Sequence, residues 1–213
     1  MELTHLHKLI ARGEGELVEF KKKANHPEKI IREAVAFANS SGGHLFIGVA
    51  DDCTIAGLNY PEEDEFILTK ALNELCRPHL NFSSEIVRCE NGARIVHFEI
   101  EEGDRKPHYA FLKKNHRYGK AFVRVNDKSV QASYEMRKIL KERDSFDQPI
   151  SIGDDVSALF KFFEKKSSIT LTQYQELAGL NKKLASSKLV SLALSGALKI
   201  LPQEGEDLFF PAR

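Results

Sequence analysis

Along the first two thirds of this chain, segments with apolar residues at helical spacing alternate with short apolar runs that are typical of strands. This pattern predicts helices alternating with strands. Helical spacing predicts helices over residues 4–12, 25–39, 62–76 and 129–143. Runs rich in β-branched and aromatic residues predict strands over residues 17–20, 44–50, 84–89 and 93–100, with further strand signals in 105–125. The ENGA turn before residue 94 predicts a hairpin. This element order predicts an α/β (α+β) domain.

A separate pattern begins in the last third of the chain. Residues 144–153 are rich in turn formers, and we take them as a linker between domains at residues 1–143 and 154–213. Beyond the linker, three helical patterns, at residues 154–166, 170–180 and 181–196, precede a hairpin that turns at EGED. This is the element order of a small winged helix-turn-helix domain, whose third helix enters the major groove of DNA.

The third of these helices carries residue types that suit DNA. Its expected core face consists of Leu184, Leu189, Leu192 and Ala193. Its start and outer face carry residues that suit phosphates and base edges, namely Lys182, Lys183, Ser186, Ser187 and Lys188. The alternative is a dimerisation or protein-contact module, and the tip of the hairpin carries no basic residue. The sequence leaves both interpretations open.

The formal charges cancel over the whole chain but not within it. The 213 residues are 42% apolar and 29% charged with a net charge of zero, as in an ordinary globular protein with a buried core. Residues 50–104 nevertheless contain thirteen acids and four bases, whereas residues 105–143 contain twelve bases and three acids. Either the two blocks pair across the fold, or the second forms a surface for a polyanion, because surface patches rather than totals decide affinity for nucleic acid.

Several classes of site are not indicated. The chain contains no P-loop, GxGxxG, HExxH or GxSxG motif, so no nucleotide cofactor, zinc protease site or nucleophile elbow is expected. The three cysteines show no CxxC spacing and are expected to be reduced thiols. No apolar run is long enough to span a bilayer and no signal peptide is evident, so we expect a cytoplasmic protein without a membrane partner.

Five motifs occur together in the first domain. They are EGELVEFK at residues 14–21, AFANSSGGHLFIGVADD at 36–52, TIAGL at 54–58, KPHY at 106–109 and AFVRVNDKSVQAS at 121–133. Together they resemble the Schlafen AlbA-type domain family over about residues 9–140. The resemblance implies an α/β domain that binds nucleic acid. Bacterial members that look like this chain, with a trailing winged helix, are commonly described as transcriptional regulators.

The resemblance also implies an alternative function, a divalent-metal endoribonuclease. Its three carboxylates would be Glu14, Glu19 and Asp51, with Asp52 as the alternative to Asp51 because this part of the motif departs from the family pattern. Carboxylates from a helix exit and a strand end can converge on Mg²⁺ or Mn²⁺, which would activate water. The same acids can instead hold backbone amides or pair with basic side chains. The sequence therefore does not decide whether the protein is an enzyme, and no cofactor is certain.

The first function we expect is a nucleic-acid-binding protein, specifically a DNA-binding transcriptional regulator, with RNA as the other target. The expected contact residues are Lys21, Lys22, Lys23, Lys113, Lys114, Arg117, Lys120, Arg124, Lys128, Lys182, Lys183 and Lys188. Small glycines in NSSGG either allow a tight turn or let the backbone approach a phosphate. Regulators often dimerise, so a homodimer is compatible with this function. A protein-interaction adaptor without nucleic-acid affinity is the third hypothesis.

Overall fold

A computed structural model describes residues 3–112, 117–147 and 153–212 of the chain. It divides into two compact units, Met1–Val130 and Gln131–Arg213. Each unit has its own hydrophobic core.

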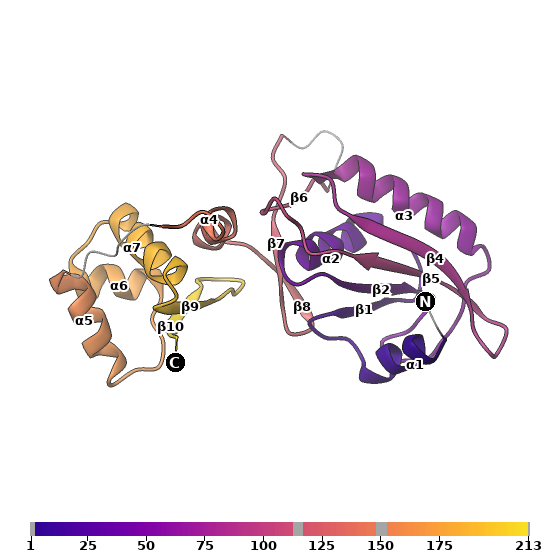
Figure 1. Cartoon of the computed structure of the whole chain (residues 1–213), viewed down its shortest axis with the longest axis horizontal. Coiled ribbons are helices and arrows are strands. Elements are labelled where there is room, and N and C mark those ends of the chain that lie inside the picture. Colours follow the sequence, from indigo (N-terminus) through magenta and orange to yellow (C-terminus); the bar gives the residue numbers. More distant parts are fainter. Residues whose placement is uncertain (1–2, 113–116, 148–152, 213) are drawn as a thin grey trace. The chain divides into compact units, whose positions relative to one another are not determined.

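The first unit is built on a four-stranded sheet in the order β1-β2-β5-β4 (Figure 1). Its strands are β1 (Val18–Lys21), β2 (Gly43–Ile47), β4 (Phe82–Arg88) and β5 (Arg94–Ile100). Strands β1 and β2 are parallel, because helix α2 (Pro27–Asn39) connects them, and the other neighbours are antiparallel. The predicted hairpin at ENGA is the β4–β5 connection, and the mixed α/β fold is confirmed.

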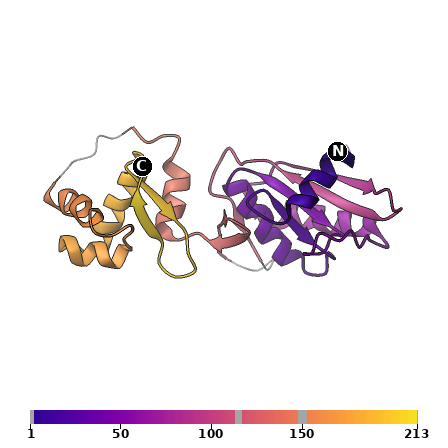
Figure 2. The ribbon, with the colours of Figure 1, turned by 90° about the horizontal axis from the view of Figure 1, so that it is seen from below.

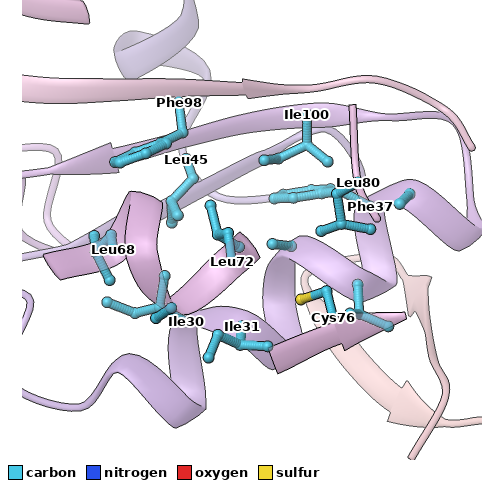
Figure 3. Close-up of a cluster of buried hydrophobic side chains, with 14 of the residues drawn as sticks. Ile30, Ile31, Phe37, Leu45, Leu68, Leu72, Cys76, Leu80, Phe98 and Ile100 are labelled. Atoms are coloured by element: carbon cyan, nitrogen blue, oxygen red, sulfur yellow. The ribbon is translucent and has the colours of Figure 1, made fainter. Parts of the chain in front are cut away.

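Helices cover both faces of this sheet. Helices α2 and α3 (Pro61–Leu75) pack on one face through apolar side chains that include Ile30, Leu68 and Phe98 (Figure 3). Helix α1 (Leu3–Arg12) packs on the other face, where Leu6 meets the rings of β1 and β2. The strands are therefore apolar on both faces, which explains why β2 reads as a continuous hydrophobic run.

The turn after α2 requires glycine. Gly42 has a φ of +73°, and a Cβ there would lie 2.7 Å from the carbonyl oxygen of Ile100. A Cβ on Gly43 would lie 2.4 Å from the Phe37 ring. The glycines of NSSGG thus fit the turn interpretation of this motif, because the space beside them is already filled by the chain itself.

Two small strand pairs complete the first unit. Strand β3 (Cys76–Arg77) pairs with β6 (Tyr109–Ala110), and β7 (Phe122–Val125) pairs with β8 (Lys128–Gln131). The sequence predicted that residues 129–131 begin a helix, which is wrong. The helix, α4 (Tyr134–Glu142), begins later because the Ser133 side chain caps it by accepting the backbone N–H of Met136.

The second unit contains four helices and a hairpin within its described residues (Figure 2). After α4 come α5 (Asp154–Phe163), α6 (Leu171–Ala178) and α7 (Lys182–Leu194), followed by β9 (Leu198–Leu201) and β10 (Leu208–Pro211). Thr170 and Asn181 cap α6 and α7. Strands β9 and β10 are antiparallel, and Phe209 also bridges Ile169, which ties the hairpin to the helices.

Helix α4 packs on α7 and belongs to the second unit. The units therefore divide between Val130 and Gln131, ahead of the linker that the sequence suggested at residues 144–153. Part of that linker, residues 148–152, lies outside the described residues. The turn-rich composition after residue 143 marks a connection within the second unit, between α4 and α5.

The buried and exposed residues of helix α7 differ from those that the sequence predicted. Leu184, expected in the core, is 49% exposed, whereas Ala185 is fully buried in its place. Ser186, expected on the outer face, is also buried. The reason is that α4 covers a second side of α7, so the buried surface is wider than one amphipathic stripe.

In the part of the chain that the structure describes, no helix combines the length and the apolar character needed to cross a membrane. The cysteines are free, with Cys76 and Cys89 buried and Cys53 partly exposed.

Replacing Gly42 by alanine should destabilise the first unit by about 1–3 kcal/mol, because a positive φ is costly for a residue with a Cβ. Chemical denaturation of the two proteins measures the difference. Gly15→Ala is the matched control, since a Cβ at Gly15 meets nothing within 4 Å. Equal losses in the two variants would contradict the assigned role of Gly42.

Candidate nucleic-acid interface

The acidic segment before β1 closes the free edge of that strand. The carbonyl oxygens of Leu17 and Lys21 accept N–H groups from the β2 side, so the alternate backbone groups, those of Val18 and Phe20, point outward. There the Phe20 N–H donates to Oε1 of Glu14 at 2.9 Å, and the Gly15 N–H donates to the carbonyl of Val18 at 3.0 Å. Glu14 thus holds a backbone amide, one of the two roles that the sequence left open for it.

Arg124 of β7 is buried at the centre of an ionic network. Its Nη1 lies 2.9 Å from Oε2 of Glu19 on β1 and 3.0 Å from Oε2 of Glu33 on α2. Its Nη2 donates to the carbonyl of Gly15, and its guanidinium lies 4.7 Å from the Phe37 ring centroid. The Arg124 side chain is 1% exposed. It joins three elements and has no surface to offer a phosphate, so its predicted role in nucleic-acid binding is wrong.

Glu19 is likewise held inside the fold. Its other oxygen, Oε1, is paired with Lys21, whose Nζ also donates to the carbonyl of Phe20 at 2.9 Å. Burial raises the pKa of Glu19, the charge of Glu33 raises it further, and Lys21 and Arg124 act in the opposite direction. Glu19 lies on the strand face opposite Val18 and Phe20, and both faces are buried.

Motifs far apart in sequence meet at the end of α2. The buried Asn39 side chain donates at 2.9 Å to the carbonyls of His108 and Phe122 and accepts the His108 N–H at 2.7 Å. The next residue, Ser40, accepts the Arg124 N–H through its hydroxyl at 2.9 Å. The NSSGG, KPHY and AFVRV motifs are therefore parts of one hydrogen-bonded scaffold.

The aspartate pair lies in a turn after β2. Asp52 accepts the Thr54 N–H at 2.9 Å, and its pKa is lowered by the hydrogen bonds from Thr54. Asp51 is exposed. Cys53, which follows the two aspartates, adopts a φ of +67°. The Asp52 side chain therefore forms an Asx turn, in which it accepts the backbone N–H of the residue two positions later.

The three predicted carboxylates do not form a metal site. Glu14 binds a backbone amide, Glu19 is paired with two cations, and Asp51 is on the surface. Among the residues that the structure describes, no three His, Cys, Asp or Glu side chains are arranged to hold a metal ion. The residues present do not fit a Mg²⁺ or Mn²⁺ centre, and we derive no nuclease step from them.

The predicted cationic contacts fall into three groups. Lys22, Lys23, Arg117, Lys120, Lys128, Lys182 and Lys183 are exposed, and none forms an ion pair with another described residue. Lys21, Arg124 and Lys188 are paired with carboxylates, the last with Asp155. Lys113 and Lys114 lie outside the described residues. Arg117 also lies over the exposed Tyr118 ring, 5.6 Å from its centroid.

Histidines gather on the α1 face of the sheet, which sequence reasoning missed because they are far apart in the chain. Nδ1 of His44 on β2 lies 3.1 Å from Nε2 of His97 on β5, and Nδ1 of His97 lies 3.1 Å from Oε1 of Glu85 on β4. His97 also stacks on Phe46, and His5 of α1 meets His44 edge-on. Burial lowers the pKa of both His44 and His97. The signal available in the sequence was period two, which puts His44 and Phe46 on one strand face.

A family model described as Schlafen, AlbA_2 matches residues 14–133, more than half of the chain. The chain belongs to the Schlafen AlbA_2 family. The matched residues run from Glu14, which closes the edge of β1, to Ser133, which caps α4. The Schlafen AlbA_2 match therefore contains the whole Arg124 and Asn39 scaffold.

Two solved structures are similar to this Schlafen AlbA_2 chain. One is the N-terminal domain of a protein from Nitrosomonas europaea that is named as related to the ATP-dependent DNA helicase RecG, with 18% identity and a TM-score of 0.44 over 72% of this chain and 96% of that one. The other is a protein from Corynebacterium diphtheriae, with 15% identity and a TM-score of 0.43 over 99% of this chain and 38% of that one. Comparison with curated proteins gives no match.

Replacing Arg124 by alanine should destabilise the first unit by about 3–5 kcal/mol, because Glu19 and Glu33 would stay buried without their shared cation. Urea denaturation measures the loss. Lys128→Ala, at an exposed position in the same hairpin, should change stability by no more than about 0.5 kcal/mol. An Arg124 variant as stable as this control would show that the network is not structural.

Stability should fall on acidification below the ordinary histidine pKa of about 6.5. His44 and His97 have lowered pKa values in the fold, so the unfolded chain binds protons first and stability present at neutral pH is lost as the pH drops. His97→Phe keeps a ring against Phe46 but cannot take a proton, so its denaturation midpoint should vary less between pH 7.5 and 5.5. The exposed His79→Gln should keep the wild-type dependence. If all three proteins respond alike, the paired histidines do not cause the effect.

Proposed function

We propose that this protein binds nucleic acid and acts as a DNA-binding transcriptional regulator. The proposal is consistent with membership of the Schlafen AlbA_2 family over residues 14–133. In this proposal the first unit grips a phosphate backbone, and the second unit adds contacts to duplex DNA. In this proposal Glu14 and Glu19 serve the fold.

The observation that carries the proposal is a set of exposed cations that form no ion pair with any described residue. Lys22 and Lys23 follow β1, Arg117 and Lys120 lie between β6 and β7, and Lys128 opens β8. No carboxylate of the described residues pairs with any of them, although the same unit pairs Lys21, Arg124 and Lys106. Unpaired lysine and arginine side chains are the groups that release counterions from a nucleic acid.

For the second unit we propose a winged helix. Its three helices α5 to α7 are followed by an antiparallel hairpin, the element order of that module. The N-terminal turn of α7 carries Lys182 and Lys183 exposed, with Ser187 one turn later. Ser186 and Lys188 are engaged within the unit, so the proposed contact surface is narrower than the sequence predicted.

Binding to duplex DNA should weaken steeply with salt. If five of the seven exposed cations contact phosphates, the logarithm of the association constant should fall against the logarithm of salt concentration with a slope of about −4.5. Lys22→Gln combined with Lys23→Gln should reduce the steepness by about 2, because each lost contact removes about 0.9. Fluorescence anisotropy with a labelled duplex at several salt concentrations measures both values.

Lys29→Gln, an exposed position on α2 outside the proposed set, should leave the slope unchanged. The proposal fails if no duplex DNA binds even at low salt. If the double variant and the Lys29 variant change the slope equally, the assigned residues are not the contacts.

A further inference from the structure

The second unit contains a cavity of about 660 Å³, and the proposed function uses only Lys182, Lys183 and Ser187 of its lining. It lies between α4, the start of α7 and the loop that joins β9 to β10, all within Gln131–Arg213. Its volume is in the range of small-ligand sites. Leu171 and Phe209, both buried, supply an apolar wall.

Two carboxylates inside this cavity are buried without a cation. Glu135 of α4 is 9% exposed and accepts the Ser186 hydroxyl at 2.6 Å, and Asp207 is 6% exposed and accepts the Ser133 hydroxyl. No lysine, arginine or histidine among the described residues pairs with either of them. Burial raises the pKa of Asp207, hydrogen bonds oppose this, and the charge of Glu135 adds to it. Asp207 also accepts the Gln203 N–H at 3.3 Å, so both acids have neutral donors but no cation. Buried carboxylates normally have a charged partner, so the cavity favours a ligand that brings further hydrogen-bond donors.

The entrance of the same cavity has the opposite character. Lys182 and Lys183 are exposed there without an ion pair in the described chain. Glu206 also lines the cavity, and its pKa is lowered by hydrogen bonding to Thr172 and by the charge of Lys182. Lys138 has only a contact of 3.9 Å with Glu142. Tyr134 also lines the cavity and is 57% exposed, which leaves its ring free to stack. Cations beside an exposed aromatic ring are the combination that binds single-stranded nucleic acid.

We infer that this cavity holds one unpaired nucleotide of a single strand, with a base that carries an exocyclic amino group. The phosphate contacts the lysines at the entrance, the base lies against Tyr134, and its amino group donates to Asp207 or Glu135. Cytosine has an amino donor at the position where thymine has a carbonyl acceptor. The cavity therefore prefers cytosine to thymine. This inference rests on the proposed nucleic-acid function and adds a base preference to it.

The test is a comparison of labelled oligo-dC and oligo-dT, each eight nucleotides long, with the full chain by fluorescence anisotropy. The two pyrimidine strands have equal charge and similar stacking surface. Oligo-dC should bind about tenfold more tightly, which corresponds to one base read by a carboxylate. Asp207→Asn supplies an amide donor for the thymine carbonyl, so this variant should lose or reverse the preference, as should Glu135→Gln.

Two controls separate base reading from general charge effects. Glu204→Gln removes an exposed carboxylate in the same loop but outside the cavity, and should keep the cytosine preference. Lys183→Gln should weaken oligo-dC and oligo-dT equally, because phosphates carry no base identity. A preference for oligo-dC that persists in both Asp207→Asn and Glu135→Gln overturns the inference.

The failure of this inference is distinguishable from failure of the proposed function. If oligo-dC and oligo-dT bind equally, or neither binds, while duplex DNA binds with the expected salt slope, the inference fails and the proposed function stands. If a free amino acid such as L-lysine protects the chain thermally in an Asp207-dependent way and oligo-dC does not, the cavity takes a zwitterion and the inference is wrong.

Discussion

Burial of the Arg124 guanidinium between two glutamates is the interaction on which the first unit depends. Glu19 comes from the sheet, Glu33 from α2 and Arg124 from the β7–β8 hairpin, so one side chain fixes three elements. Such a network costs desolvation energy and repays it only if every charge is matched. Lys21 also pairs with Glu19, Arg32 pairs with Glu33, and the Gly15 carbonyl accepts from Arg124. If the hairpin moved away from α2, both buried carboxylates would lose the cation that they share.

This buried network also assigns roles to the charged residues at positions 14–23, where acidic and basic side chains follow one another. Of these residues, Glu14 and Glu19 serve the fold, and Lys21 neutralises one of them. Lys22 and Lys23 remain on the surface. The charged residues of this segment thus fall into two groups, one held inside the fold and one exposed on the surface. In the proposed function, nucleic-acid contacts and fold stability therefore depend on adjacent positions of the same segment.

The sequence predicted most elements because their signals are local. Helical spacing and the ENGA turn depend on neighbours in the chain, and they place the helices and the β4–β5 hairpin correctly except for the start of α4. Burial of charge depends on distant partners, and Arg124 is 105 residues from Glu19. One local signal of this buried charge did exist, since Glu33 lies one helical turn before Phe37 within an apolar stripe of α2. An acid there indicates a buried cation, but the sequence does not say which one. The position of α4 on α7 had no local signal at all.

The pairing of the Phe20 amide with Glu14 has a consequence for self-assembly. A sheet edge with free amide and carbonyl groups invites a strand from another molecule, and that is how many ordered aggregates begin. Here one margin of the sheet is sealed by a side chain and a folded-back backbone segment of its own chain. A second copy that extended the sheet would have to attach at the opposite margin, along β4. Growth by strand addition is thereby limited to one direction, which favours closed pairs of molecules over endless fibres.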